Sequence, residues 1–344
     1  MTQSIFSIDI GEKYIKVADV EKKGNNLLAL SLAYDQAPAN MYLSESIKDT
    51  EQTKLLIQKL IKDAGIRKKN VNIIIPDSHS YSQILEMPSI SEKELLSAIR
   101  YQADQFIPIP IEKVNLDIEI LAEDKKNKKL VILLVAAPLS NIEKITDLIE
   151  QSGLIPETIQ TELSGSFGLI NMIKPINDEC NLYINFGLTS TTLYLICPNI
   201  LTNKKDSVPL QIRNFSIGFD LFIKDVKTNL NLSEHEVTNL LETNGFDNSA
   251  SYDISKIIES PYNEFQLEIQ KFIQSAKSSY DVTINKLFIF GEGNKLKGIQ
   301  NKLNQTFSIA TDVYNPYPLF IKNNVVDFFK NDLPLFIPAI GSTL

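Results

Sequence analysis

Short apolar runs alternate with polar turns over the first eighty residues, and they predict strands and a helix. Strand-like runs with β-branched side chains span residues 4–10, 14–19 and 71–75. Apolar residues recur at helical spacing over residues 51–64, and Gly65 follows where a helix C-cap is expected. The order of two strands, a helix and a strand predicts one α/β layer.

Residues 81–154 follow a different pattern, which predicts a subdomain inserted into the first lobe. Ser91 and Glu94 form a capping-box pattern at the start of a helix. Prolines end that helix, because proline disfavours the helical conformation of the residue before it. The predicted elements are a helix to about Phe106, strands at 115–121 and 129–136, and a helix at 141–152. The core of the first lobe is then residues 1–80 with 155–178.

The second lobe is predicted to span residues 179–344, with a helical subdomain at about 225–282. A buried strand followed at once by glycines and a helix, as at residues 286–303, is a common place for an anion or a nucleotide. The other predicted elements are a hairpin at 181–197, a strand at 210–216, and helices at 219–229, 233–244 and 262–280.

One turn pattern occurs in both lobes. Asp9-Ile-Gly11 and Asn185-Phe-Gly187 each lie between two apolar runs, as in a β-hairpin whose turn presents backbone N–H groups. Two copies indicate a duplicated domain with a ligand cleft between its halves.

Composition excludes several classes of function. The net charge of −8 and pI near 5.1 argue against nucleic acid or an anionic membrane surface as the main partner. His79 and His235 have no ligand-like spacing, so no metal site is expected. Cys180 and Cys197 are too far apart for a CxxC motif, and we expect reduced, half-buried thiols. No apolar run reaches the length of a membrane span, which predicts a soluble, cytoplasmic protein.

The glycine turns at Gly11, Gly187 and Gly291 resemble the phosphate 1, phosphate 2 and adenosine motifs of the actin, sugar kinase and heat-shock ATPase superfamily. Their order matches, and so does the inserted subdomain. The resemblance implies an α/β fold of the actin-like type, with two duplicated RNase H-like lobes and a helix-strand-strand-helix subdomain in the first.

More narrowly, the chain resembles the PilM family of type IV pilus assembly proteins, relatives of the division protein FtsA. The resemblance lies mainly in residues 99–110, with their Ile-Pro-Ile-Pro turn, and in the strand at 131–137. Asn315-Pro-Tyr317 and Pro338-Ala-Ile-Gly341 also match.

Membership of that family implies a cytoplasmic adapter at the inner face of the membrane, where it binds the short cytoplasmic tail of the membrane protein PilN. The tail would occupy a groove between the first lobe and its inserted subdomain, and a motor ATPase is a second candidate partner. The chain would reach the membrane through its partner and not by insertion, and it could form a homo-oligomer. The residues expected to bind the tail are Phe106, Ile107, Pro108, Ile109 and Pro110. The alternative is that these prolines only end a helix.

The same resemblance assigns nucleotide-facing positions, with ATP and Mg²⁺ as the candidate ligands. In the first hairpin, Lys16 would meet the β and γ phosphates, but Glu12 follows the glycine and would repel them. In the second lobe an Asn replaces the acid, and Phe219 follows Gly218, where its side chain would occupy space that a nucleotide needs. Leu241 stands at a polar position, and Glu292 interrupts the last glycine turn. The expected nucleotide-binding residues are Asp9, Gly11, Lys16, Asn185, Gly187, Thr189, Thr191, Thr192, Gly218, Gly291 and Gly293.

Two classes of function remain open from the sequence. The first is a non-enzymatic adapter with a degenerate nucleotide cleft, which the substitutions at residues 185, 219, 241 and 292 favour. The second is an active ATPase or small-substrate kinase, which Asp9 and Lys16 favour. Glu162 is the one candidate to orient an attacking water, against the alternative of a structural role. We expect no hydrolysis and weak or absent nucleotide binding.

Overall fold

The computed structural model describes residues 5–38, 41–42, 46–101, 107, 109–124, 127–172, 179–198, 207–247 and 253–344. The chain divides into two compact units. Unit 1 consists of Met1–Lys174, Asn199–Lys204 and Pro316–Leu344. Unit 2 consists of Pro175–Pro198 and Lys205–Asn315.

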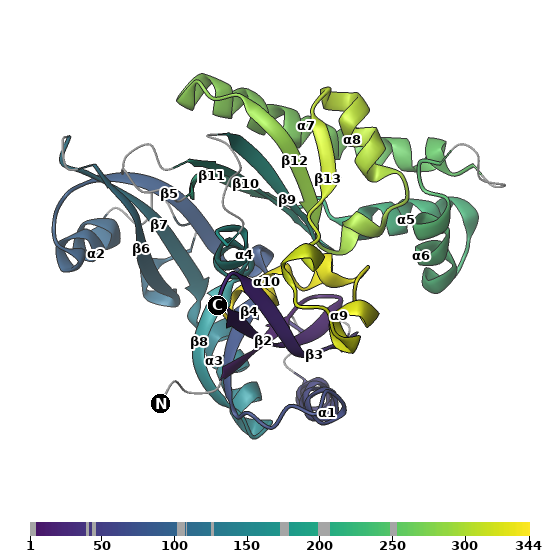
Figure 1. The fold of residues 1–344 in the computed structure, drawn as a ribbon, viewed down its shortest axis with the longest axis horizontal. Helices are drawn as coiled ribbons and strands as arrows, with labels where there is room; N and C mark the ends of the chain where they lie inside the picture. The colour runs from purple at the N-terminus through teal and green to yellow at the C-terminus, as the bar shows by residue number, and fades with distance from the viewer. Residues whose placement is uncertain are drawn as a thin grey trace. The chain divides into compact units, whose positions relative to one another are not determined.

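Unit 1 is built on a five-stranded sheet in the order β3-β2-β1-β4-β8 (Figure 1). The first three strands form an antiparallel meander, and β4 and β8 run parallel to β1. Alternate apolar residues of β1, among them Phe6 and Ile8, pack with Ile57 of α1 and Ile149 of α3. The strands are β1 (Ile5–Ile10), β2 (Tyr14–Lys23), β3 (Asn26–Gln36), β4 (Asn70–Ile75) and β8 (Ile155–Thr161), and the helices are α1 (Ile47–Asp63) and α3 (Leu139–Gln151).

The inserted subdomain is a three-stranded antiparallel sheet in the order β5-β7-β6, with α2 on one face (Figure 1). Alternate residues of β6, beginning with Val114 and Leu116, pack with Leu95 and Ile99 of α2. The predicted capping box is confirmed, because the Glu94 carboxylate accepts a hydrogen bond from the Ser91 N–H at 2.9 Å. The elements are β5 (Tyr81–Pro88), α2 (Glu92–Tyr101), β6 (Val114–Asp124) and β7 (Lys129–Pro138).

The C-terminal segment belongs to unit 1, although the sequence placed it in the second lobe. Helix α9 (Asn324–Phe328) contacts β3, and α10 (Ile337–Gly341) packs against α4 (Glu162–Ile170). The Ser7 hydroxyl on β1 donates to the Ala339 carbonyl at 2.6 Å. This hydrogen bond and these contacts join the C-terminal segment to the first sheet.

Glycine is required where α4 and α10 meet. A Cβ on Gly165 would lie 2.6 Å from the Pro338 carbonyl oxygen, and one on Gly341 would lie 1.8 Å from the Gly165 oxygen. Both distances are well inside van der Waals contact. The two backbones therefore touch directly, with no room for a side chain between them.

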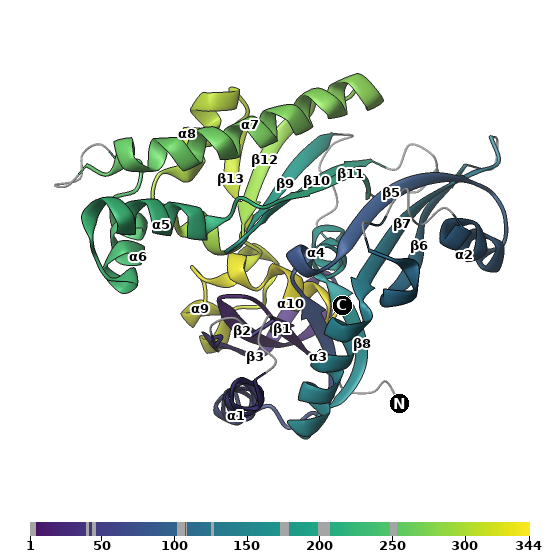
Figure 2. The same cartoon turned by 180° about the vertical axis from the view of Figure 1, so that it is seen from behind.

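Unit 2 repeats the topology of the first sheet in the order β11-β10-β9-β12-β13. The inner strands β9 and β10 form the predicted hairpin, and β12 and β13 run parallel to β9. Helix α7 runs along the face of the sheet that Figure 2 turns to the viewer, and its apolar residues share a core with β9, β10 and β12. The elements are β9 (Cys180–Phe186), β10 (Thr191–Pro198), β11 (Ser207–Phe215), α5 (Phe219–Leu230), α6 (Glu234–Thr243), α7 (Ser255–Tyr280), β12 (Ile284–Phe290), α8 (Ile299–Phe307) and β13 (Ala310–Val313).

The two cysteines form a disulfide, so the prediction of reduced thiols is wrong. Cys180 on β9 and Cys197 on β10 lie with their Cα atoms 4.2 Å apart. The antiparallel register that pairs Asn181 with Ile196 puts them opposite each other one position further along. Sequence spacing did not reveal this, because a hairpin brings distant positions face to face.

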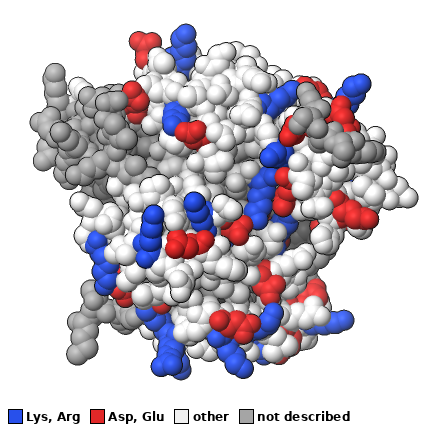
Figure 3. Space-filling model, turned by 45° about the vertical axis from the view of Figure 1, so that its right-hand side comes forward, with Lys and Arg blue, Asp and Glu red and all other residues white. Residues whose placement is uncertain are grey.

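Charges of both signs are interspersed on the face shown in Figure 3, with no large area of one sign among the described residues. No helix in the described part of the chain has the length and hydropathy needed to cross a bilayer.

We predict that Gly165→Ala destabilises the chain by about 1–3 kcal/mol, because its methyl group overlaps the Pro338 carbonyl. Alanine otherwise stabilises a helix relative to glycine. A decrease in the stability of Gly165→Ala would therefore come from the contact with α10. Thermal unfolding followed by circular dichroism measures the change. The exposed helical variant Ser97→Ala is the control and should leave stability unchanged or slightly raised. A Gly165→Ala variant as stable as the unchanged chain would contradict the close packing.

Candidate functional site

The first glycine turn joins β1 to β2, and it brings two of the predicted residues into contact. Asp9 and Lys16 face each other across the hairpin, with Lys16 Nζ 2.9 Å from Asp9 Oδ2 and both side chains buried. A Cβ on Gly11 would lie 2.7 Å from the Tyr14 carbonyl oxygen, so only glycine fits. The lysine expected to meet phosphate is thus held in an ion pair with Asp9.

Glu12 contacts the short turn that follows β4, at Asp77–His79. Its Oε1 accepts a hydrogen bond from the Ser78 hydroxyl at 3.0 Å and lies 3.2 Å from Nε2 of His79. The His79 ring stacks on Tyr42, with ring centroids 4.0 Å apart. Burial raises the pKa of Tyr42, and the nearby carboxylates of Asp9, Glu162 and Glu12 raise it further. Sequence patterns gave no sign that His79 and Tyr42 lie beside this turn.

Glu162 has a hydrogen-bonding role in the fold. Its Oε2 accepts from the Asp77 N–H at 3.1 Å, and Asp77 Oδ1 accepts from the Leu163 N–H at 3.1 Å. These two bonds tie the start of α4 to the turn after β4. They support the structural alternative for Glu162 over a catalytic one.

The corresponding turn in unit 2 lies between β9 and β10, and its polar side chains bond to one another or to backbone. The Asn185 amide donates to the Tyr194 hydroxyl at 3.4 Å. The Thr191 hydroxyl donates to the Ile217 carbonyl at 2.6 Å, and the Thr192 hydroxyl accepts from the Asn214 amide at 2.8 Å. Gly187 and Thr189 lie in the same turn.

Phe219 and Leu241 are core residues of unit 2. Phe219 is 1% exposed, and its ring centroid is 6.3 Å from that of Phe186. Leu241 on α6 is fully buried in the same core. Only glycine fits at position 218, since a Cβ there would lie 2.1 Å from the Leu188 carbonyl oxygen. The Phe219 side chain therefore packs inside the unit, which argues against the interpretation that it fills a nucleotide's place.

The last glycine turn brings a carboxylate to the turn between β9 and β10. Gly291 has φ of +83°, and a Cβ on Gly293 would lie 2.1 Å from the Phe186 ring. Between these glycines Glu292 is 7% exposed, and its Oε2 lies 4.0 Å from where a Cβ on Gly187 would be. A negative charge thus stands beside the turn that would receive a phosphate.

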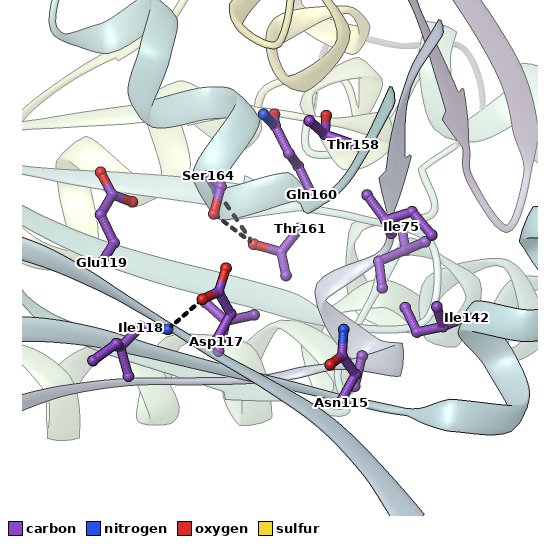
Figure 4. A pocket seen from close by; sticks show the side chains of 13 residues that line it. Ile75, Asn115, Asp117, Ile118, Glu119, Ile142, Thr158, Gln160, Thr161 and Ser164 are labelled. Atoms are coloured by element: carbon purple, nitrogen blue, oxygen red, sulfur yellow. Dashed lines mark hydrogen bonds between the residues drawn. The ribbon is translucent and has the colours of Figure 1, made fainter. Parts of the chain in front are cut away.

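A separate cavity of about 430 Å³ lies within unit 1, between the inserted subdomain and the five-stranded sheet (Figure 4). One side is the face of β6 and β7 that points away from α2, and the other is β8 with the start of α4. Burial raises the pKa of Glu119, and the neighbouring Asp117 carboxylate raises it further. The lining residues are Ile75, Asn115, Asp117, Ile118, Glu119, Val135, Ala137, Ile142, Thr158, Ile159, Gln160, Thr161 and Ser164. We call this cavity the β6–β8 groove.

Three of the five residues predicted to bind a partner tail are described, and none of them lines the β6–β8 groove. Ile107 is buried in the core of the inserted subdomain, and Ile109 packs against that core. Pro110 precedes a 3₁₀ turn at Ile111–Lys113. Phe106 and Pro108 lie outside the described residues. The groove residues carried a weaker signal in the sequence, namely polar residues at every second position of β6.

The two five-stranded sheets share one topology, and a three-stranded sheet is inserted in unit 1. This arrangement defines an actin-like fold. Solved structures with this fold include MreB 5 of Spiroplasma citri bound to AMPPNP, with a TM-score of 0.54, 11% identity, and coverage of 100% of this chain and 96% of that one. The ethanolamine utilization protein EutJ of Carboxydothermus hydrogenoformans gives a TM-score of 0.51 and 10% identity over 98% of this chain and 88% of that one.

A PilM-PilN type IV pilus biogenesis complex contains a more similar chain, with a TM-score of 0.84, 19% identity, and coverage of 98% of this chain and 97% of that one. The family model for type IV pilus assembly protein PilM matches residues 7–344. The chain therefore belongs to the PilM family of type IV pilus assembly proteins.

Proposed function

We propose that this chain is a cytoplasmic adapter of a type IV pilus or related machine, and that it binds the cytoplasmic tail of a PilN-like inner-membrane protein in the β6–β8 groove. The observation that carries the proposal is the groove itself, about 430 Å³ in volume and bordered by the outermost strands of two sheets. The related chain solved in a PilM-PilN complex supports the choice of partner.

The groove suits an extended peptide. Strand β8 is the last strand of its sheet, and among the described residues it pairs only with β4. Four consecutive residues of β8, from Thr158 to Thr161, line the groove. The outer edge of such a strand offers backbone N–H and C=O groups to an added strand.

Apolar side chains give the groove places for the side chains of a peptide. Ile75 and Ile142 line one end of it, and Val135 and Ala137 lie on the β7 face. Backbone pairing along β8 would supply affinity, and these contacts would discriminate between sequences.

The three glycine turns that were expected to bind a nucleotide fit ATP poorly. The carboxylate of Glu292 lies beside the Gly187 turn, its side chain is buried, and like charges repel more strongly where water is excluded. Lys16 would have to leave Asp9 to reach a phosphate. The alternative, an active ATPase, rests on the presence of Asp9, Gly11 and Lys16 in one hairpin.

Other roles follow from an adapter of this kind. Membrane association would come through the PilN-like partner, and it would bring the chain to the inner face of the membrane. A pilus motor ATPase and further copies of the chain are additional candidate partners.

We predict that the N-terminal cytoplasmic segment of the PilN-like protein of the same genome binds the chain, and that Gln160→Trp weakens binding at least tenfold. The Gln160 side chain lies in the groove (Figure 4), and an indole ring there would fill the space that the peptide needs. Fluorescence anisotropy with a labelled peptide measures the affinity. Gln83→Trp, an exposed position on β5 outside the groove, is the matched control and should bind normally. Equal affinities for the two variants would contradict this site.

We predict that calorimetric titration with ATP and Mg²⁺ gives a Kd weaker than about 0.1 mM, which corresponds to a binding free energy below about 5.5 kcal/mol in magnitude. Glu292→Gln removes the charge with little change in shape, and it should strengthen any binding. Micromolar affinity in the unchanged chain, or turnover that Asp9→Ala abolishes, would favour the ATPase alternative.

A further inference from the structure

Strand β6 presents two carboxylates to the groove. Residues 114, 116 and 118 point into the core of the inserted subdomain, so Asp117 and Glu119 lie together on the opposite face. They are the charged residues among those that line the groove, and both are acidic. Figure 4 shows the two side chains on the same side of the cavity.

Within the described part of the chain, no basic side chain forms an ion pair with either carboxylate. Asp117 Oδ1 accepts a hydrogen bond from the neighbouring Ile118 N–H at 2.9 Å. The described residues that line the groove from other elements are uncharged, and they include Val135 and Ala137 of β7, Ile142 of α3, Thr158, Gln160 and Thr161 of β8, and Ser164 of α4. Two like charges therefore lie on the same face of β6, and none of the described residues that line the groove supplies a countercharge.

A cationic side chain is the ligand that this arrangement favours. A charge between the two carboxylates would relieve their repulsion and form charge-assisted hydrogen bonds. A metal ion fits less well, since no group of three or more His, Cys, Asp or Glu that could hold one exists among the described residues. The amide and apolar lining suits the rest of a peptide.

We propose that Asp117 and Glu119 select a Lys or Arg side chain on the peptide that occupies the β6–β8 groove. This inference rests on the proposed function, because it names a feature of the same peptide. It makes the two carboxylates specificity determinants of the groove, beside the backbone edge of β8.

A double-mutant cycle tests the proposal with the full chain and the acetylated N-terminal segment of the PilN-like protein as the probe. Asp117→Asn combined with Glu119→Gln should weaken binding about tenfold and reduce its salt dependence. Replacing the recognised Lys or Arg of the peptide by Gln should weaken binding to the unchanged chain equally, and should cost little further in the double variant. Glu112→Gln combined with Glu150→Gln removes the same net charge outside the groove and should leave binding unchanged.

Several outcomes would overturn the proposal. Unchanged affinity of the double variant, purely additive effects of the two changes, or tight binding by a tail without Lys or Arg would each contradict charge selection while leaving groove binding intact. Loss of binding on acetylation alone would assign the cation to the terminal amine. A segment that fails to bind the unchanged chain would contradict the proposed function as well.

The pH dependence provides a second readout. The raised pKa of Glu119 means that it takes up a proton at a higher pH than a solvated glutamate does. A bound cation favours the ionised form, so affinity should rise as pH increases through that pKa, while Lys and Arg keep their charge. Glu119→Gln should flatten the profile, and an unchanged slope in that variant would count against the proposal.

Discussion

Direct backbone contact between α4 and α10 joins the C-terminal segment to the rest of unit 1. It depends on glycine at Gly165 and Gly341, since a Cβ at either position would overlap the facing carbonyl oxygen. Helix α4 begins where β8 ends, so the position of α4 also fixes the end of the open strand. The C-terminal segment thereby supports one wall of the β6–β8 groove. An interaction between helices far apart in sequence shapes the surface on which the proposed function depends.

The glycine turns and the groove differ in how their polar groups are satisfied. In the turns, Lys16 pairs with Asp9, the Thr191 hydroxyl bonds to a carbonyl, and Glu292 lies beside the Gly187 turn. In the groove, β8 has an open edge within the described chain and β6 carries two carboxylates of like charge. A binding site needs groups that a ligand can satisfy better than the protein itself does. By that criterion the groove is the stronger candidate.

Local patterns predicted much of the fold. The two hairpins, the capping box at Ser91 and the inserted subdomain were all visible as periodicity and turn chemistry. The strands β3, β8 and β13 were not predicted. In β8 the sequence Ile-Pro-Glu-Thr-Ile-Gln-Thr lacks strong alternation, and its pairing with β4 is long-range. The return of Pro316–Leu344 to unit 1 was also hidden, because it depends on the fit between α10 and α4.

The candidate site could be predicted only in part. Asp9 and Lys16 were correctly placed on one hairpin, since their separation matches a tight antiparallel turn. The aromatic substitution at Phe219 was interpreted as facing a nucleotide, whereas its ring lies in the core. The groove was expected near the Ile-Pro-Ile-Pro turn, but Ile107 and Ile109 pack into the subdomain's own core. Polar residues at alternate positions of β6 are typical of a strand with one face in solvent. Only the structure shows that β8 lies across the groove from them.

Hydrogen–deuterium exchange of the full chain, with and without the N-terminal segment of the PilN-like protein, tests the central claim most directly. Added backbone pairing should slow exchange of amides in β8 (Ile155–Thr161), with smaller protection in β6. The turns at residues 9–16 and 185–192 should be unaffected. Protection confined to those turns, or binding without any protection of β8, would contradict the account.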